Sequence, residues 1–475
     1  MEHPTHALRQ RIDDIRELLE RFQVEDHLIT SKGGPRQALE QEVTRRQQGV
    51  ELERRLRPLH AADIAELLEG LPGDERLLVW PHIPEPRRGD VLLELDDAVL
   101  EGMVAELPPE QLISTMQQLD ADDLGYLGNH LPAEMFQHAL TALGSEERSW
   151  VHASIAYPED SVGHLMSSEM VVVRDDDTLA TVEAMLKDLA ELPQHTDKLF
   201  VVDQRGVLCG ALPLKDILLN ERTRQVGEIA KKRVVRFHPE DEAEEAGRAF
   251  ERYDLISAPV TNERGKLIGR LTVDIVMDYI REESEADVLN VAGVVETEDL
   301  FANIWDSARN RWLWLSINLL TAFAISRIIG AFEGTIDQLV ALASLMPIIA
   351  AVAGNTGNQT AALVIRSLAL DQIRAGNVWH LFRKEIAISI LNGMVWGLAV
   401  GAFAYVFYAN LALSAVVTVA MMLSFLIASL IGVGAPMILE RSGRDPAMGS
   451  SVIVTGLTDA MGFFLFLMLA TVLLI

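Results

Sequence analysis

Five long apolar stretches in the last third of the sequence constrain the fold more than any other feature. They cover residues 312–332, 338–363, 386–409, 412–439 and 450–475 of a chain of 475 residues. A helix needs roughly 20 apolar residues to cross the hydrocarbon core of a bilayer, because that core is about 30 Å thick. We therefore predict an all-α transmembrane domain with five helices over residues 312–475.

The charges of the links between these stretches predict how the helices cross the membrane. The first link holds two acidic residues and no basic one, the second holds four basic residues, and the fourth holds two. Lys and Arg concentrate in cytoplasmic loops. We therefore expect the second and fourth links and the N-terminus in the cytoplasm, and Ile475 outside. Residues 1–15 agree with this orientation, since they lack the apolar run of a secretory signal.

The first 300 residues differ sharply in charge from the apolar part. They carry 61 acidic and 32 basic residues, a net charge of -29. Such a surface repels phosphate, which excludes nucleic acid as a partner and favours cations. With Cys209 as its single cysteine, the chain forms no internal disulfide. The sequence also lacks a phosphate-binding glycine loop, an HExxH motif and a Cys/His cluster, so it does not have the pattern of an enzyme.

A period of twelve residues runs through the first part of the chain. Apolar residues recur at Leu71, Ile83, Leu95, Leu107, Leu119, Leu131 and Leu143, and each is followed by Pro, Asp or Gly. Proline and glycine stop helices, and aspartate caps them. We predict one helix of about ten residues per period, stacked as an all-α solenoid in a domain over residues 1–155. A generic helical bundle is the alternative.

A second internal repeat covers residues 160–283. VGHLMSSEMVVV from Val162 aligns with VGEIAKKRVVRF from Val226, and VVDQRGVLCGALPLKD (201–216) aligns with PVTNERGKLIGRLTVDI (259–275). Each copy predicts a short strand, a helix, two strands around a glycine turn and a closing helix. The repeat resembles a tandem pair of CBS domains, an α/β module, with one domain over 160–222 and the other over 223–283.

The resemblance to CBS pairs implies a candidate nucleotide site, with ATP as the possible ligand. In the nucleotide-binding pattern, a Thr after the last strand is followed three residues later by an Asp that binds ribose. The first copy has Pro213 and Asp216, and the second has Thr272 and Ile275, so neither copy holds the complete pair. The candidate contacts are Thr272, Asp216 and Pro259.

A single aspartate, Asp459, stands within the fifth apolar stretch. A charged residue at the centre of a bilayer helix costs roughly 2.5–3.5 kcal/mol on insertion scales. The carboxyl group is therefore protonated, paired with a base such as Arg327, or exposed to a water-filled pore. Thr455 and Gly462 share a helix face with Asp459, which favours the pore.

The second apolar stretch contains the polar motif GNTGNQ at residues 354–359, after Pro347. Pro347, Gly354 and Gly357 weaken a helix, so we expect broken or loosened backbone that lines a wet cavity. The alternative is that the small residues allow close helix packing and that the amides bond across helices. The amide side chains concerned are those of Asn355, Asn358 and Gln359.

The order of these parts resembles the MgtE family of magnesium channels over nearly the whole chain. The specific motifs are Pro347 with GNTGNQ and Arg366, and DPA (445–447) before TGLTD (455–459). The resemblance implies a homodimer in the bacterial plasma membrane, with a pore on the two-fold axis in which Asp459 captures hydrated Mg²⁺. It places the remaining pore candidates at Thr455, Gly462, Asn355, Gly357, Asn358 and Gln359. Oxygen ligands also accept other divalent cations.

The resemblance also implies a connector with a plug helix over residues 284–311. In the family, carboxylates near this helix bind regulatory Mg²⁺ and hold the pore shut, and the candidates here are Asp278, Glu282, Glu283 and Asp287. A solvated acidic helix is the alternative. Two other functions stay open at this point: a secondary exchanger driven by a counter-ion, and a membrane-tethered ion sensor that conducts nothing.

Overall fold

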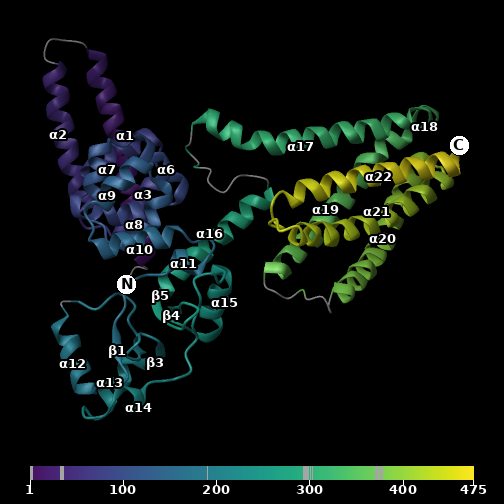
Figure 1. The fold of residues 1–475 in the computed structure, drawn as a ribbon. Coiled ribbons are helices and arrows are strands. Elements are labelled where there is room, and N and C mark those ends of the chain that lie inside the picture. The colour runs from purple at the N-terminus through teal and green to yellow at the C-terminus, as the bar shows by residue number, and fades with distance from the viewer. Residues whose placement is uncertain are drawn as a thin grey trace. The chain divides into compact units, whose positions relative to one another are not determined.

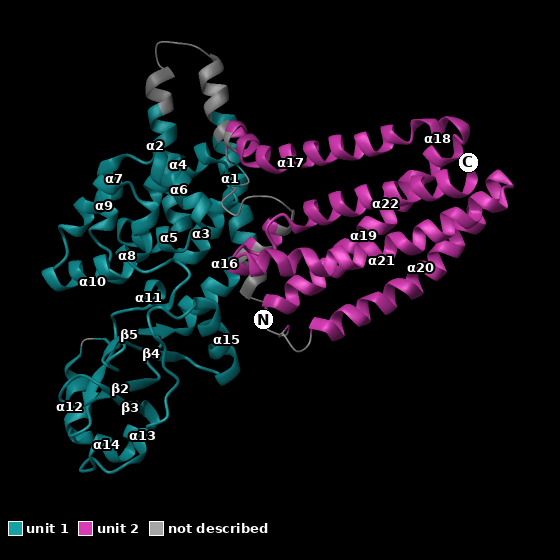
Figure 2. Cartoon of the chain, turned by 45° about the vertical axis from the view of Figure 1, so that its right-hand side comes forward, with its two compact units in different colours: residues 1–282, 299–302 teal, residues 283–298, 303–475 magenta. Residues whose placement is uncertain are grey.

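The computed structural model describes residues 4–32, 37–189, 191–292, 299, 301, 303–369, 373 and 378–475. The chain forms two compact units, which Figure 2 shows in different colours. Unit 1 consists of residues 1–282 with 299–302, and unit 2 consists of residues 283–298 with 303–475.

Unit 1 begins with an all-helical domain. Helices α1 (Pro4–Lys32) and α2 (Gln37–Leu56) lie side by side as a long hairpin (Figure 1). Shorter helices follow as α3 (Ala61–Glu69), α4 (Gly73–Val79), α5 (Arg88–Leu93), α6 (Asp97–Glu106), α7 (Pro109–Met116), α8 (Ala121–Leu127), α9 (Ala133–Leu140) and α10 (Ser145–Ile155). Three 3₁₀ turns complete the domain, at Trp80–His82, Glu85–Arg87 and Gly128–His130.

The twelve-residue period corresponds to one helix per repeat, as predicted. The first six apolar residues of the period are at most 9% exposed, and Leu143 is partly buried against the same core. Pro72, Pro108 and Pro132 each directly precede a helix, and Asp120 caps α8 by accepting the N–H of Asp123 over 2.9 Å. Each of the first six periodic residues therefore lies in the core, and helix boundaries follow the same period.

The second internal repeat follows, and its first copy has the predicted strands and helices in order. The first copy contains α11 (Val162–Leu165), β1 (Val172–Arg174), α12 (Leu179–Asp188), β2 (Lys198–Val202), β3 (Leu208–Pro213) and α13 (Leu214–Leu219). Strand β2 pairs parallel with β1 and antiparallel with β3. The second copy contains α14 (Val226–Ile229), α15 (Ala243–Tyr253) and the antiparallel strands β4 (Ser257–Thr261) and β5 (Leu267–Thr272).

The two copies differ in their first strand. In the second copy this strand is reduced to a single parallel bridge between Phe237 and Val260. The aligned turn glycines behave alike, because Gly206 and Gly265 have φ angles of 78° and 72°. Those left-handed values suit glycine, which has no Cβ atom to clash with the backbone.

Helix α16 (Val273–Ala292) follows β5 directly, and its residues from Glu283 onward belong to unit 2. The remaining helices of unit 2 are α17 (Ile304–Ala331), α18 (Glu333–Gln338), α19 (Ala341–Ala369), α20 (Val378–Tyr408), α21 (Leu411–Arg441) and α22 (Ser450–Leu474). The expected connector over 284–311 thus contains the end of α16 and the start of α17. Residues 293–298 lie outside the described part.

Five helices of unit 2 are long and apolar enough to cross a membrane, which confirms the predicted number. They are α17 from Ser307 onward, α19, α20, α21 and α22. Helix α21 packs against α19, α20 and α22, while α17 packs against α22 (Figure 1). The expectation of a broken second span is wrong, since α19 continues through Pro347 and both glycines of its polar motif. Neighbouring helices that pack closely against a span support such weak positions.

Candidate ion site and carboxylate cavity

Asp459 lies in the middle of α22 and faces α19. A Cβ atom built on Gly354 of α19 would lie 3.6 Å from Asp459 Oδ1, so the glycine leaves room for the carboxylate. Asp459 is half-buried, and it has no hydrogen-bond or ion-pair partner among the residues that the structure describes. The alternative that Arg327 pairs with it is therefore not met among those residues.

A polar contact joins the same two helices one turn away. Asn358 Nδ2 of α19 donates to Thr455 Oγ1 of α22 over 3.0 Å. Asn358 Oδ1 is buried and finds no hydrogen-bond partner in the described part of the chain. Leaving a buried acceptor unsatisfied costs about 1–3 kcal/mol, so this oxygen is suited to accept from water, including the water shell of a cation. Together the two helices offer amide, hydroxyl and carboxylate oxygens, the ligand types that Mg²⁺ prefers.

The other four pore candidates do not join this group. Gly357 is buried in a helix contact, where an added Cβ atom would lie 2.9 Å from Val454 Cγ1. Gly462 is buried against α21, with Ser424 Oγ 3.7 Å from the position of a Cβ atom. Both glycines are packing positions within the chain, and a place for them in the pore stays a prediction. Asn355 and Gln359 lie on the exposed side of α19.

The loop before α22 is attached to the end of α16, and all the residues involved belong to unit 2. The backbone N–H of Gly449 donates to the carbonyl oxygen of Asn290 over 3.0 Å, and Asn290 Nδ2 donates to Asp445 Oδ2 over 3.5 Å. Gly449 has a φ angle of 60°, and a Cβ atom there would lie 1.9 Å from the indole ring of Trp314 in α17. Only glycine fits at this position.

A cavity of about 250 Å³ in unit 1 gathers carboxyl groups from several elements. Its walls come from α5, α8, α10, α11 and α16 and the segments next to them, and they include Glu94, Asp122, Asp123, Asp278 and Glu282. Two of these five, Asp278 and Glu282, are sensor candidates from the sequence. The other three were missed, because nothing local to a short solenoid helix marks the side that faces a later element.

Burial and mutual repulsion raise the pKa of two carboxyl groups in this cavity. Burial, together with the charges of Asp120 and Asp122, raises the pKa of Asp123 to about 7. Burial and the charge of Asp97 raise the pKa of Glu282 to about 7 as well. Arg281 also lines the cavity and lowers the pKa of Glu282, but burial and the neighbouring carboxylates outweigh it. A cation bound among these groups would relieve their mutual repulsion.

Asp122 differs from its neighbours because donors surround its carboxylate. It accepts from Trp150 Nε1 over 2.6 Å, from Ser167 Oγ over 2.7 Å and from the N–H of Ser168 over 2.8 Å. Among the described residues, no three Asp, Glu, His or Cys side chains already stand in a metal-binding arrangement. The carboxylates share a cavity, but they do not converge on one point.

The two remaining sensor candidates lie further along α16. Glu283 is exposed, and it belongs to unit 2. The side chain of Asp287 lies outside the described part of the structure.

The nucleotide candidates are spread over the CBS pair. Thr272 is buried at the end of β5, and its hydroxyl has no hydrogen-bond partner in the described part of the chain. Pro259 is buried in β4, and Asp216 is half-buried in α13. A separate cavity of about 480 Å³ lies beside β3 and is lined by Lys232, Arg233 and Arg236, but by none of the three candidates.

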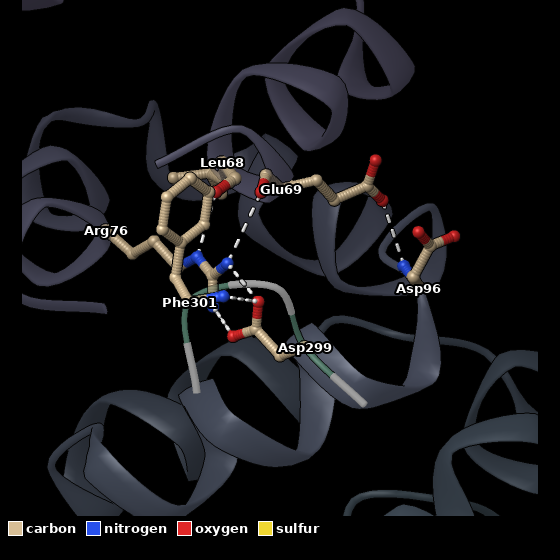
Figure 3. A network of polar contacts seen from close by, with 6 residues as sticks. All are labelled: Leu68, Glu69, Arg76, Asp96, Asp299 and Phe301. Carbon is tan, nitrogen blue, oxygen red and sulfur yellow. Dashed lines mark hydrogen bonds and ion pairs between the residues drawn. The ribbon is translucent and has the colours of Figure 1, made fainter. Parts of the chain in front are cut away.

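A buried ion pair holds Asp299, which lies between α16 and α17, against α4 of the helical domain, within unit 1 (Figure 3). Arg76 is 2% exposed and binds both carboxylate oxygens of Asp299, with 2.9 Å between Nη2 and Oδ1. Its Nε atom donates to the carbonyl oxygen of Leu68 over 2.9 Å, and Asp299 Oδ1 also accepts the N–H of Phe301 over 3.0 Å. The pair is thus almost fully satisfied.

Comparison with known proteins accounts for the arrangement of these parts. The model of the MgtE divalent cation transporter matches residues 346–469, that of the MgtE intracellular N domain matches 59–160, and that of the CBS domain matches 162–221 and 226–282. The magnesium transporter MgtE of Thermus thermophilus is 32% identical over 429 residues, which cover 88% of this chain and 94% of that protein. The chain belongs to the MgtE family. The MgtE of Bacillus subtilis is 27% identical, with 86% of this chain and 93% of that protein covered.

Membership of the MgtE family makes the chain a multi-pass membrane protein of magnesium transport, and the family is one of transporters rather than enzymes. The predicted order of helical domain, CBS pair and five-helix membrane domain is confirmed. Among solved structures, the cytosolic domain of the Mg²⁺ channel MgtE in complex with ATP is 30% identical. It covers 50% of this chain and 98% of its own, with a TM-score of 0.45.

Proposed function

We propose that this MgtE protein is a Mg²⁺-selective channel that admits the ion across the bacterial plasma membrane and is closed by intracellular Mg²⁺. The observation that carries the proposal is Asp459, a carboxylate inside the membrane helices with no partner among the described residues. A charge in that position is costly unless something compensates it. A divalent cation that passes along α19 and α22 supplies the compensation.

Mg²⁺ gives up its water reluctantly, so we propose that the ion meets Asp459 in hydrated form. In a homodimer with the pore on its two-fold axis, two Asp459 carboxylates balance the two charges of the ion. Asn358 and Thr455 lie close enough on the same two helices to contact its water shell. With the N-terminus in the cytoplasm, the membrane potential drives entry by roughly 2.3 kcal/mol per charge per 100 mV.

For the regulatory part, we propose that Mg²⁺ binds in the carboxylate cavity of unit 1. Asp278 and Glu282 face that cavity together with Glu94, Asp122 and Asp123. An ion that binds only the packed arrangement stabilises it by mass action, and without the ion the carboxylates repel one another. Glu283 and Asp287 remain candidates for the same role further along α16.

ATP is a second proposed ligand, bound by the CBS pair. The buried hydroxyl of Thr272 lacks a partner among the described residues, and the basic cavity beside β3 suits phosphate groups. Ile275 replaces the ribose-binding aspartate and argues for weak binding. Titration calorimetry of the full-length protein with ATP and Mg²⁺ tests this, and an absence of binding heat at millimolar ATP excludes it.

The channel itself is tested by transport. The chain should restore growth of a bacterium that lacks its own Mg²⁺ transport, and Asp459→Ala should not. In liposomes, uptake should follow the membrane potential with no Na⁺ or H⁺ gradient present. Uptake that requires such a gradient would instead identify an exchanger, and wild-type uptake by Asp459→Ala would move the ion pathway elsewhere.

A further inference from the structure

Helix α20 carries a carboxyl group that is buried inside the membrane unit, at Glu385. The residue is 6% exposed, and its Oε2 atom accepts a hydrogen bond from Thr360 Oγ1 of α19 over 3.2 Å. Thr360 is itself only 4% exposed. No basic side chain of the described residues forms an ion pair with Glu385. Acidic residues buried among membrane helices usually have a function, and the hydrogen bond of Glu385 connects that function with α19.

The support for Glu385 is rigid, because α20 and α21 are packed tightly together. Cβ atoms on Gly393 and Gly397 of α20 would each lie 3.0 Å from backbone atoms of α21, so the two helices approach as closely as glycine allows. Ser389, one turn after Glu385, donates to the carbonyl oxygen of Glu385 over 2.8 Å and is hydrogen-bonded to Ser429 of α21. Helices α20 and α21 thus form one block against which α19 is placed.

Helices α19 and α21 meet at two glycines beside the polar motif, whereas apolar side chains of both helices pack together nearer the start of α19. A Cβ atom on Gly432 of α21 would lie 2.5 Å from the carbonyl oxygen of Gly357 in α19, so the two glycines meet face to face. Glycines bring two helices together without side chains that interlock. Beside these glycines, a directional hydrogen bond constrains the angle of α19 about its own axis, and the bond from Thr360 to Glu385 is such a bond.

That angle determines where Asn358 lies. Residues two positions apart project about 200° from each other on an α-helix, so Thr360 and Asn358 lie on opposite sides of α19. At a side-chain radius of about 5–6 Å, a 20° rotation moves the Asn358 amide by about 2 Å. Such a shift would break its 3.0 Å hydrogen bond to Thr455, one turn from Asp459.

We propose that Glu385 is a positioning residue of the ion pathway, whose hydrogen bond to Thr360 fixes the rotation of α19 so that Asn358 meets Thr455 beside Asp459. The proposal rests on the proposed function of α19 and α22 as the pathway. Glu385 acts through Thr360 and Asn358, and it does not itself touch the ion.

The test compares Mg²⁺ uptake rates of full-length variants in liposomes, normalised to folded protein by size-exclusion chromatography. Glu385→Ala and Thr360→Val should each lower the rate about tenfold, since each removes the same buried hydrogen bond. Glu385→Gln should stay within about twofold of the wild type, because its amide oxygen still accepts from Thr360. The double variant Glu385→Ala/Thr360→Val should be no slower than either single variant.

Two further variants separate positioning from general packing. Ser414→Ala removes a hydrogen bond of 2.6 Å from α21 to α20 at Gly401, away from α19, and should keep the wild-type rate. In an Asn358→Ala background, Glu385→Ala should cause no additional loss, since the group that it positions is gone. Loss in Glu385→Gln equal to that in Glu385→Ala, or an additive effect with Asn358→Ala, would overturn the proposal. Wild-type uptake by Asp459→Ala would overturn only the proposed pathway, because the comparison of Glu385 with Asn358 is independent of Asp459.

Discussion

Two carboxylates of this chain, Asp299 in unit 1 and Asp459 in unit 2, differ in how their charge is compensated. Asp299 is bound by both terminal nitrogens of a buried arginine and by a backbone N–H. Asp459 has no partner among the described residues. A buried charge that is paired avoids the cost of an uncompensated charge, whereas a charge left unpaired in an apolar setting persists for a reason other than stability. The comparison gives the first carboxylate a structural role and agrees with the transport role that we propose for the second.

The largest effect that the comparison predicts is on transport. Asp459→Asn keeps the size of the side chain but removes its charge, and Mg²⁺ uptake should fall on the order of 10²-fold. The reason is that the compensated charge is worth about 2.5–3.5 kcal/mol, with a tenfold change in rate per 1.36 kcal/mol. Uptake by reconstituted protein gives the rate, and the thermal unfolding midpoint should not fall. A lower midpoint with unchanged uptake would mean that Asp459 is structural after all.

For Asp299, the paired carboxylate, we expect a loss of stability when its partner is removed. Arg76→Ala leaves Asp299 buried without its partner, which should destabilise α3 and α4 by about 3–5 kcal/mol. Amide hydrogen exchange in the full-length protein measures this loss. Arg87→Ala is the matched control, because the bonds of Arg87 to described residues go to the carbonyl oxygens of Leu59 and Arg57. This substitution should cost about 1 kcal/mol.

Removing both partners sharpens this prediction. Arg76→Met combined with Asp299→Leu should recover most of the lost protection, since the cost comes from the unpaired charge and not from the missing bond. A double variant as unstable as Arg76→Ala would show that the pair itself provides the stability.

The smallest effect concerns the carboxylate cavity, whose carboxyl groups, taken together, are neither fully paired like Asp299 nor all without a partner among the described residues, as Asp459 is. The pKa of both Asp123 and Glu282 is raised to about 7, far above that of exposed carboxyl groups. The packed cavity therefore binds protons more tightly than the open one, and this stabilisation is lost as pH rises from about 4 to 7. Without Mg²⁺, proteolysis within residues 273–282 should be several-fold slower at pH 6 than at pH 8.

A matched pair of variants tests the source of that pH effect. Glu282→Gln should reduce the difference between pH 6 and pH 8, because one of the two titrating groups is removed. Glu285→Gln alters an exposed residue of the same helix and should leave the difference unchanged. Equal behaviour of the two variants would mean that the titration lies outside the cavity.

Local patterns in the sequence predicted the parts of this molecule that local forces determine. The twelve-residue period found the short helices because proline and aspartate act on their own helix ends. The helix face shared by Thr455 and Asp459 followed from helical spacing alone. Continuity of α19 was missed, since the support for Pro347 and the glycines comes from neighbouring helices.

Contacts between segments that are distant in the sequence could not be predicted from local patterns. Arg76 and Asp299 are 223 positions apart, and neither residue stands out locally. Glu385 was placed in a link of the membrane domain, because the predicted third span began at residue 386, directly after this residue. Helix α20 instead begins at Val378, and the charge is accommodated by Thr360 on another helix. Hydropathy places a span boundary at a charge unless a partner for that charge is known.

The hydrogen bond between Asn290 and Gly449 is made by backbone atoms on both sides. Most point substitutions delete neither the carbonyl nor the N–H. This link between α16 and the start of α22 therefore tolerates most changes of side chain. Only changes in loop length, or loss of the glycine under Trp314, can remove it. In related sequences we therefore expect the glycine directly before α22 to be more constant than the identity of the residue at position 290.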